Sequence, residues 1–226
     1  MAVIYLIRHG QAAFSSADYD QLTPLGEEQS RVFGAAMRLR VPKPDHVVSG
    51  GMKRHRQTAA ACLQAMSLDP ACECDDGFNE YDHEDIIDRH MDRRVMVEVV
   101  KAAPDRRRAF EQLFTQAMRR WQSGTCDADY RETWSTFRGR CLAALERVCA
   151  RLQSGQSALV FTSGGVISVV AEQLLCTSPA EYAALNWRLV NAGITKLVYG
   201  SGGLSLATLN EHGYFEGINS RLLTYR

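Results

Sequence analysis

The chain begins with Ala2-Val3-Ile4-Tyr5-Leu6-Ile7-Arg8-His9-Gly10-Gln11, an apolar run that ends at a basic pair and a glycine. The apolar residues 2–7 predict a buried strand. An arginine beside a histidine at the end of a strand places a fixed cation next to a possible nucleophile, which is what an enzyme needs to hold a phosphate and attack it. We therefore take this strand end as the reference point for the rest of the chain.

Strand-like and helix-like segments alternate along the chain, which is typical of an α/β fold with a largely parallel sheet. Thr23 as the cap and Pro24 as the first residue predict a helix that ends at Val41. Ser178 and Glu181 form a capping box that predicts a helix from Pro179. Further helices are predicted at about 52–66, 105–120, 133–152 and 166–175. Further strands are predicted at 45–49, 158–161, 194–199 and 204–209, with a possible short one at 72–74.

The predicted fold is a three-layer α/β/α sandwich with a mostly parallel central sheet. A chain of 226 residues is long enough for one such domain, and we assign residues 1–226 to it. Residues 80–153 differ from the rest because they are helix-rich and charged, without a clear strand. We interpret about 82–128 as a helical lid inserted over the sheet.

The composition argues against several partners. Lys+Arg and Asp+Glu both number 26, so the formal net charge is zero and neither a nucleic-acid nor a membrane partner is expected. The seven cysteines include no Cys-x-x-Cys pair, and no zinc spacing is present. No signal peptide precedes the first strand and no apolar run approaches ~20 residues. The expectation is a reduced, cytoplasmic protein; its oligomeric state stays open.

Four polar segments should meet at the carboxyl edge of the sheet, where ligands of open α/β sheets bind. They are Arg8-His9-Gly10, residues 53–58, Phe78-Asn79-Glu80 and Thr162-Ser163-Gly164-Gly165. Together they offer a nucleophile, cations, a carboxylic acid and a helix start whose N–H groups suit an anion.

These segments resemble the histidine phosphatase superfamily, also called the phosphoglycerate-mutase-like family. The resemblance rests on Arg8-His9-Gly10-Gln11, Thr23-Pro24-Leu25-Gly26, residues 53–59, Asn79-Glu80 and the strand–turn–helix at 159–170, in the family's order over nearly the whole chain. It implies a phosphatase that acts on a phosphorylated small molecule through a phosphohistidine, with no metal or organic cofactor.

The resemblance also implies a role for each matching residue. His9 would be the nucleophile, and a partner on its other ring nitrogen should fix its tautomer. Arg8 and Arg54 would bind the phosphoryl oxygens. Glu80 would protonate the leaving oxygen and then activate water. Substrate contacts would come from the residues at four further positions, Gln11, Ser15, Ser163 and Gly164.

Two positions depart from the family pattern. Ser163 stands where the family usually has a second histidine, and Ser15 where it often has asparagine. Loss of one transition-state donor costs on the order of 10²–10³ in rate. Two alternatives to the phosphatase therefore stay open: a mutase-like phosphotransferase, and a catalytically weak protein that binds a phosphate ligand. Residues 81–85 lack the family's usual glycine-containing segment, which favours phosphatase over mutase, and His83 could replace the missing histidine.

Simpler interpretations apply to several residues. We interpret Lys53 and His55 as part of a solvated helix face, and Ser163 could be only a helix cap. Residues 82–85, with Asp88 and His90, are expected to be solvated rather than a metal site. A serine-hydrolase elbow at Ser163 would need Gly-x-Ser-x-Gly, and Phe161 breaks that pattern.

Overall fold

The computed structural model describes residues 1–13, 20–69, 71–176 and 179–225. These residues form a six-stranded mixed sheet with the strand order β3-β2-β4-β1-β5-β6. The strands are β1 (Ala2–Arg8), β2 (His46–Ser49), β3 (Glu73–Cys74), β4 (Ser157–Thr162), β5 (Ile194–Gly200) and β6 (Gly203–Glu211). β3, β2, β4 and β1 pair in parallel, whereas β5 is antiparallel to β1 and β6.

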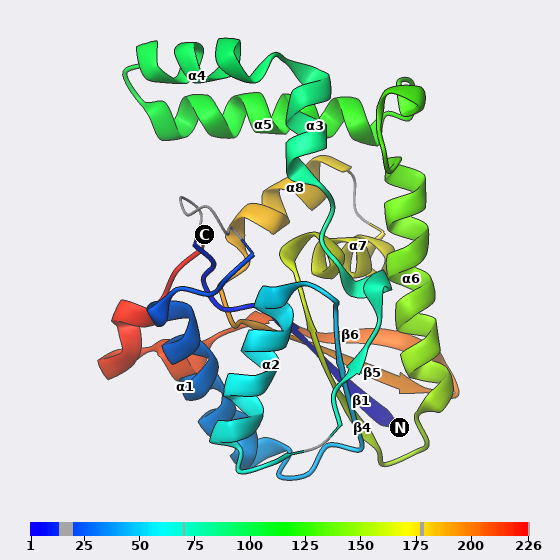
Figure 1. Cartoon of the computed structure of the whole chain (residues 1–226). Coiled ribbons are helices and arrows are strands. Elements are labelled where there is room, and N and C mark those ends of the chain that lie inside the picture. The colour runs from blue at the N-terminus through cyan, green and yellow to red at the C-terminus, as the bar shows by residue number, and fades with distance from the viewer. Residues whose placement is uncertain (14–19, 70, 177–178, 226) are drawn as a thin grey trace.

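Helices cover both faces of the sheet (Figure 1). α1 (Pro24–Arg40) and α2 (Lys53–Ala65) lie on one face, and α6 (Trp134–Arg151) and α7 (Gly164–Leu175) lie on the other. The central strand β1 is apolar on both sides: Ile4 and Leu6 enter the core with α6 and α7, while Tyr5 and Ile7 enter the core with α1 and α2. The predicted three-layer α/β fold is confirmed.

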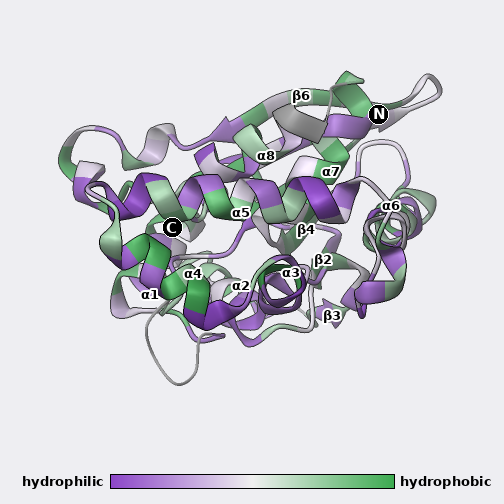
Figure 2. Cartoon of the chain, turned by 90° about the horizontal axis from the view of Figure 1, so that it is seen from above, coloured by the Kyte–Doolittle hydropathy of each residue, from purple (hydrophilic) through white to green (hydrophobic). Residues whose placement is uncertain are grey.

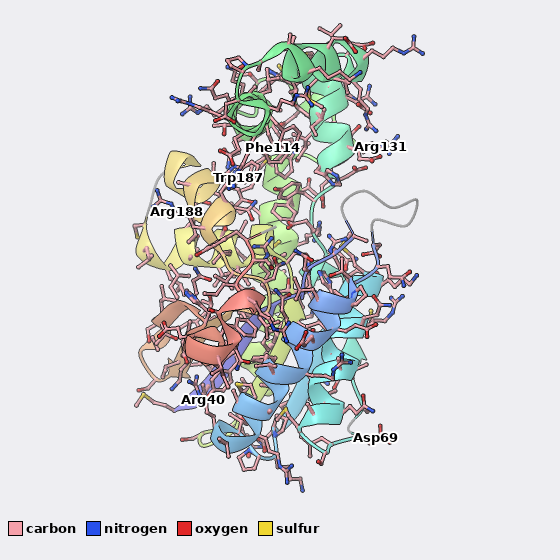
Figure 3. All side chains as sticks on the ribbon, turned by 90° about the vertical axis from the view of Figure 1, so that its left-hand side faces the viewer. Arg40, Asp69, Phe114, Arg131, Trp187 and Arg188 are labelled. Atoms are coloured by element: carbon pink, nitrogen blue, oxygen red, sulfur yellow. The ribbon has the colours of Figure 1, made fainter. Side chains whose placement is uncertain are left out.

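Residues 82–128, called the helical insertion below, contain α3 (His83–His90), α4 (Arg93–Ala102) and α5 (Arg106–Gln122). These helices stand above the sheet in Figure 1, and Figure 2 shows α5 crossing over the molecule from above. Phe114 of α5 packs edge-on against Trp187 of α8 (Pro179–Arg188), with ring centroids 5.6 Å apart, and Figure 3 shows the two side by side. Movement of this insertion as a lid stays a prediction.

The predicted elements agree with the observed ones to within two residues at their described ends. Thr23 caps α1 by accepting a hydrogen bond from Gly26 N at 3.0 Å, and Pro24 is the first helical residue, as predicted. The predicted capping box includes Ser178, which lies outside the described residues. The sequence did not indicate the short 3₁₀ helices at Asp76–Phe78, Asp127–Asp129, Gly213–Phe215 and Gly217–Leu222. Within the described chain, every helix is too short or too polar to cross a membrane.

Candidate active site

The backbone around His9 is fixed by the two central parallel strands and by α2. His9 N donates to Thr162 O of β4 at 2.9 Å, and Gly10 N donates to the Thr58 hydroxyl at 3.0 Å. Gly10 packs directly against the start of α1, because a Cβ at this position would lie 2.3 Å from Gly26 O. The two glycines of the first and second motifs are therefore required by this close backbone approach.

The His9 ring is held in one tautomer. Its Nδ1 lies 2.7 Å from Gly10 O, which can only accept, so Nδ1 carries the proton and Nε2 is left with a free lone pair. His9 is 7 % exposed. Burial holds the pKa of His9 well below its usual 6.5, and the charges of Arg54 and Arg8 lower it further. The imidazole is thus neutral and nucleophilic at physiological pH.

Two buried arginines lie beside His9. The Arg8 guanidinium donates to Tyr225 O at 2.9 Å and to the carbonyl of Leu189. The Arg54 guanidinium donates to the Asp20 carboxylate at 2.8 Å. The same carboxylate accepts from Lys53 N at 2.7 Å, so Asp20 also caps the start of α2. Each arginine is therefore oriented by a partner that is distant in sequence.

Glu80 enters the site from the loop before α3. Its Oε2 accepts from Gly165 N at the start of α7 at 3.0 Å, where the positive end of the helix dipole favours an acidic group. Arg140 of α6 fixes the loop by donating to Asn79 O at 2.6 Å, and Glu132 orients Arg140. The position of the Glu80 carboxylate is thus fixed by α6 and α7, which cover one face of the sheet.

One cavity joins the four residues predicted to be catalytic. Arg8, His9, Arg54 and Glu80 all line it, together with Ala12 and Asn191. Its outer part is lined by Tyr81 and by residues of the helical insertion, namely His83, Phe110 and Phe114.

Three of the residues predicted to contact substrate, namely Gln11, Ser163 and Gly164, are not on the described lining of this cavity. Gln11 uses its side-chain oxygen to accept from the Thr23 hydroxyl at 3.0 Å. Ser163 and Gly164 lie at the start of α7 and are buried. Ser15 lies outside the described residues. The substrate contacts of these four positions stay predictions.

Comparison with known proteins identifies the family. A model of the histidine phosphatase superfamily (branch 1) matches residues 4–212. The chain belongs to the histidine phosphatase superfamily. No curated protein matches the sequence.

Solved structures of superfamily-like proteins share the fold at low sequence identity. A phosphoglycerate mutase from Bacillus anthracis str. Sterne has a TM-score of 0.66 at 18% identity, with 94% of both chains covered. A mycobacterial glucosyl-3-phosphoglycerate phosphatase has a TM-score of 0.61 at 19% identity, with 93% of this chain and 99% of the other covered. A phosphoserine phosphatase from Entamoeba histolytica in complex with 3-phosphoglyceric acid has a TM-score of 0.62 at 18% identity, with 95% and 99% covered.

The prediction that His55 lies on a solvated face of this superfamily member is wrong. His55 is 0 % exposed, and its Nε2 lies 2.6 Å from the Ser163 hydroxyl. Which face of α2 is buried depends on the elements that pack against it and not on the helix sequence alone. The glycine at position 50 leaves room for the His55 ring, because a Cβ there would lie 2.3 Å from His55 Nδ1. Ser163 occupies the predicted cap position of α7, but no described helix N–H donates to its hydroxyl.

The acidic start of the helical insertion forms ion pairs rather than a metal site. Asp88 pairs with Arg93 at 3.0 Å. The expectation of solvation is wrong for Asp85, which is 7 % exposed and pairs with Arg89 at 3.1 Å. Nowhere in residues 1–13, 20–69, 71–176 and 179–225 do three potential metal-binding side chains gather.

Sequence reasoning missed three kinds of residue at or near this site. Asp20 carried no local signal, because it acts on Arg54 across 34 positions of sequence. Phe110 and Phe114 showed helical spacing, which indicated burial but not that they face the cavity. His55 gave no sequence signal either, because its burial depends on Gly50 and on Ser163, which lie outside the helical pattern around it.

Proposed function

We propose that the chain is a phosphatase that hydrolyses a phosphate monoester of a small molecule through a phosphohistidine on His9 Nε2. The observation that carries the proposal is the His9 ring itself. Its Nδ1 donates to Gly10 O, its Nε2 is unprotonated, and the cavity that it lines also contains Arg8 and Arg54. A neutral nucleophile between two guanidinium groups suits attack on a dianionic phosphoryl group.

In the first step, His9 Nε2 attacks phosphorus, the P–N bond forms and the ester P–O bond breaks. Arg8 and Arg54 bind the non-bridging oxygens, where negative charge is held in the transition state. The Glu80 carboxyl group gives its proton to the leaving oxygen, which departs as an alcohol. Gly10 O, which accepts from Nδ1–H, stabilises the positive charge that develops on the ring.

In the second step, water attacks the phosphohistidine. The Glu80 carboxylate accepts the proton of the water as its oxygen bonds to phosphorus, and the P–N electron pair returns to Nε2. Glu80 is anchored by Gly165 N and is therefore available on the same side of the cavity in both steps. Inorganic phosphate and the starting enzyme are regenerated.

Two observations favour hydrolysis over phosphoryl transfer to a second substrate position. Residues 81–85 lack the glycine-containing segment that the mutase pattern has. In this chain the same residues lead into α3, which begins at His83. The described outer part of the cavity is lined mainly by aromatic rings, which do not hold a sugar acid in two alternative orientations.

The test is hydrolysis of 4-nitrophenyl phosphate from pH 5 to 8 by the intact protein and by the His9→Ala variant. The matched control is His46→Ala, because His46 lies at the opposite, amino end of β2. We expect turnover that His9→Ala abolishes and His46→Ala retains, and acid-labile phosphate on the intact protein after rapid quenching.

Other outcomes would replace the proposal. Equal turnover in His9→Ala would exclude the phosphohistidine. Phosphate-ester binding without turnover would favour the binding protein, and transfer of the phosphoryl group within a phosphoglycerate would favour the mutase.

A further inference from the structure

A second imidazole lies beside the nucleophile. The His55 and His9 rings have their centroids 5.8 Å apart. His55 comes from the first turn of α2, next to Arg54, rather than from the turn after β4. That turn carries Ser163, whose hydroxyl lies 2.6 Å from His55 Nε2. The shorter side chain at position 163 is thus in direct contact with a histidine from another element.

The direction of this hydrogen bond follows from the surroundings of the other ring nitrogen. No described polar atom bonds to His55 Nδ1, which is buried. If the Ser163 hydroxyl donated to Nε2, the ring proton would sit on Nδ1 as a buried donor without a described acceptor, which is unfavourable. A bare lone pair on Nδ1 is the cheaper arrangement. Nε2–H therefore donates to Ser163 Oγ.

Donation by His55 leaves the Ser163 proton free to point elsewhere. Ser163 directly follows Thr162, whose carbonyl accepts from His9 N, so its backbone is adjacent to that of the nucleophile at the start of α7, and its hydroxyl contacts the ring of His55, whose centroid is 5.8 Å from that of the His9 ring. Its oxygen serves no helix N–H in the described chain. A phosphoryl group on His9 is the acceptor that its position favours.

We infer that His55 and Ser163 act together as the second histidine of this site: His55 positions the Ser163 hydroxyl, which donates to the phosphoryl group on His9. The hydroxyl makes the contact, and His55 is a positioning residue that acts through it. The inference rests on the proposed function and adds two residues to its mechanism. It also explains why the site tolerates serine at position 163.

The burial of the pair supports a role beyond packing. Both residues are 0 % exposed, and burying an imidazole whose Nδ1 has no described partner costs free energy that an apolar side chain of similar size would avoid. Burial, together with the charges of Arg54 and Arg56, holds the pKa of His55 well below 6.5. The ring is therefore neutral, so it places neither an additional positive charge nor an acidic proton next to His9.

The test combines single and double variants: Ser163→Ala, His55→Ala, both together, and His55→Gln. A glutamine amide can donate to Ser163 from a similar position, so it should rescue what alanine loses. A transposed variant, His55→Ala with Ser163→His, places the second histidine where the superfamily usually has it. Ser168→Ala is the matched control, because Ser168 is buried on the same helix and its hydroxyl bonds to no described atom. His46→Gln controls for the loss of a histidine.

We measure kcat and KM for 4-nitrophenyl phosphate, the affinity for inorganic phosphate, and the melting temperature. Ser163→Ala and His55→Ala should each lower kcat about 10- to 100-fold, and the double variant should lose no more than either single one, because the two act as a unit. His55→Gln and the transposed variant should recover most of kcat. Ser168→Ala and His46→Gln should match the intact protein.

Three results would overturn the inference: full kcat in His55→Ala, additive losses in the double variant, or glutamine no better than alanine in variants that stay folded. Hydrolysis of an aryl acetate that needs Ser163 but not His9 would also overturn it, because the serine would then be a nucleophile. If the intact protein does not turn over at all, the proposed function fails separately. Phosphate affinity then decides, since it should still fall in Ser163→Ala and not in Ser168→Ala.

Discussion

The floor and the roof of the cavity are built on different principles. The floor consists of Arg8, His9 and Arg54, which come from a strand end and a helix start next to the sheet. These side chains are polar, each is at most 7 % exposed, and each is held by a hydrogen bond to a fixed partner. The roof consists of Tyr81, His83, Phe110 and Phe114, three of which belong to the helical insertion.

The difference separates chemistry from selection. Floor residues are oriented by the rigid central strands, so their geometry does not depend on which substrate is bound. Roof residues are mostly aromatic and offer apolar surface, which suits recognition of the ester group rather than the phosphate. Changes in the floor should therefore alter kcat, and changes in the roof should alter KM and substrate preference.

The largest effect is expected for the floor arginine of α2. Arg54→Ala should lower kcat/KM for 4-nitrophenyl phosphate by roughly 10²–10³, because one donor to the transition state is lost. Arg107→Ala is the control, since Arg107 is an exposed residue of α5 paired with Glu111. A loss of only a few-fold in a folded Arg54→Ala variant would mean that this guanidinium does not contact the phosphoryl group.

The two buried imidazoles, His9 of the floor and the neighbouring His55, predict a pH dependence of stability. The pKa values of His9 and His55 are lowered by folding, so below about pH 6.5 the unfolded chain binds protons that the folded chain does not. The free energy of unfolding should fall with decreasing pH, by up to about 1.4 kcal/mol per pH unit for each histidine. Because His9 stays neutral at pH 6.5, its protonation should not lower the activity at saturating substrate at that pH.

The measurement is urea unfolding between pH 7.5 and 5 for the intact protein and for His55→Gln. The variant lacks one of the two histidines, so the acid-side slope of its unfolding free energy should be shallower. An unchanged slope would mean that His55 is protonated in the folded state.

A smaller effect is expected for the residue that orients Arg54. Asp20→Asn keeps the helix cap but removes the charge that pairs with the guanidinium at 2.8 Å. Because Asp20 is about one-third exposed, we expect roughly a tenfold lower kcat/KM rather than the loss seen on deleting Arg54 itself. Asp88→Asn, which weakens an exposed pair within α3 and α4, should be silent. A silent Asp20→Asn would show that the strand and helix alone orient Arg54.

The smallest effect is expected in the roof. Phe110 is half-buried and lines the cavity, so Phe110→Ala should raise KM for phenyl phosphate several-fold with little change in kcat. The same variant should hydrolyse methyl phosphate as the intact protein does, because that substrate has no ring to contact. Equal losses on both substrates, or a loss in kcat alone, would contradict the division between floor and roof.

Local patterns predicted the elements well because their causes are local. The apolar run of β1, the Thr23-Pro24 start of α1 and the helical spacing in α5 and α6 each depend on residues within a few positions of one another. The same holds for the Arg8-His9-Gly10 motif, whose residues are adjacent in sequence and meet Arg54 and Glu80 because parallel strands end at one edge.

His55 shows where such reasoning stops. A histidine between two arginines is expected to be exposed to solvent. The sequence of its helix shows no apolar stripe clear enough to predict burial instead. Its burial depends on glycine at position 50 and on a serine 108 positions away. Asp20 is a similar case, since its described carboxylate bonds reach residues of α2 that are 33 and 34 positions away.

The sequence by itself determined the α/β pattern, the superfamily and the residues at the strand ends, because these follow from backbone periodicity and from motifs of neighbouring residues. Only the tertiary structure decided the tautomer of His9, the partners of Arg54 and Glu80, and the pairing of His55 with Ser163. The physical reason is that burial and hydrogen bonding are properties of an environment, and here that environment is assembled from segments far apart in the chain.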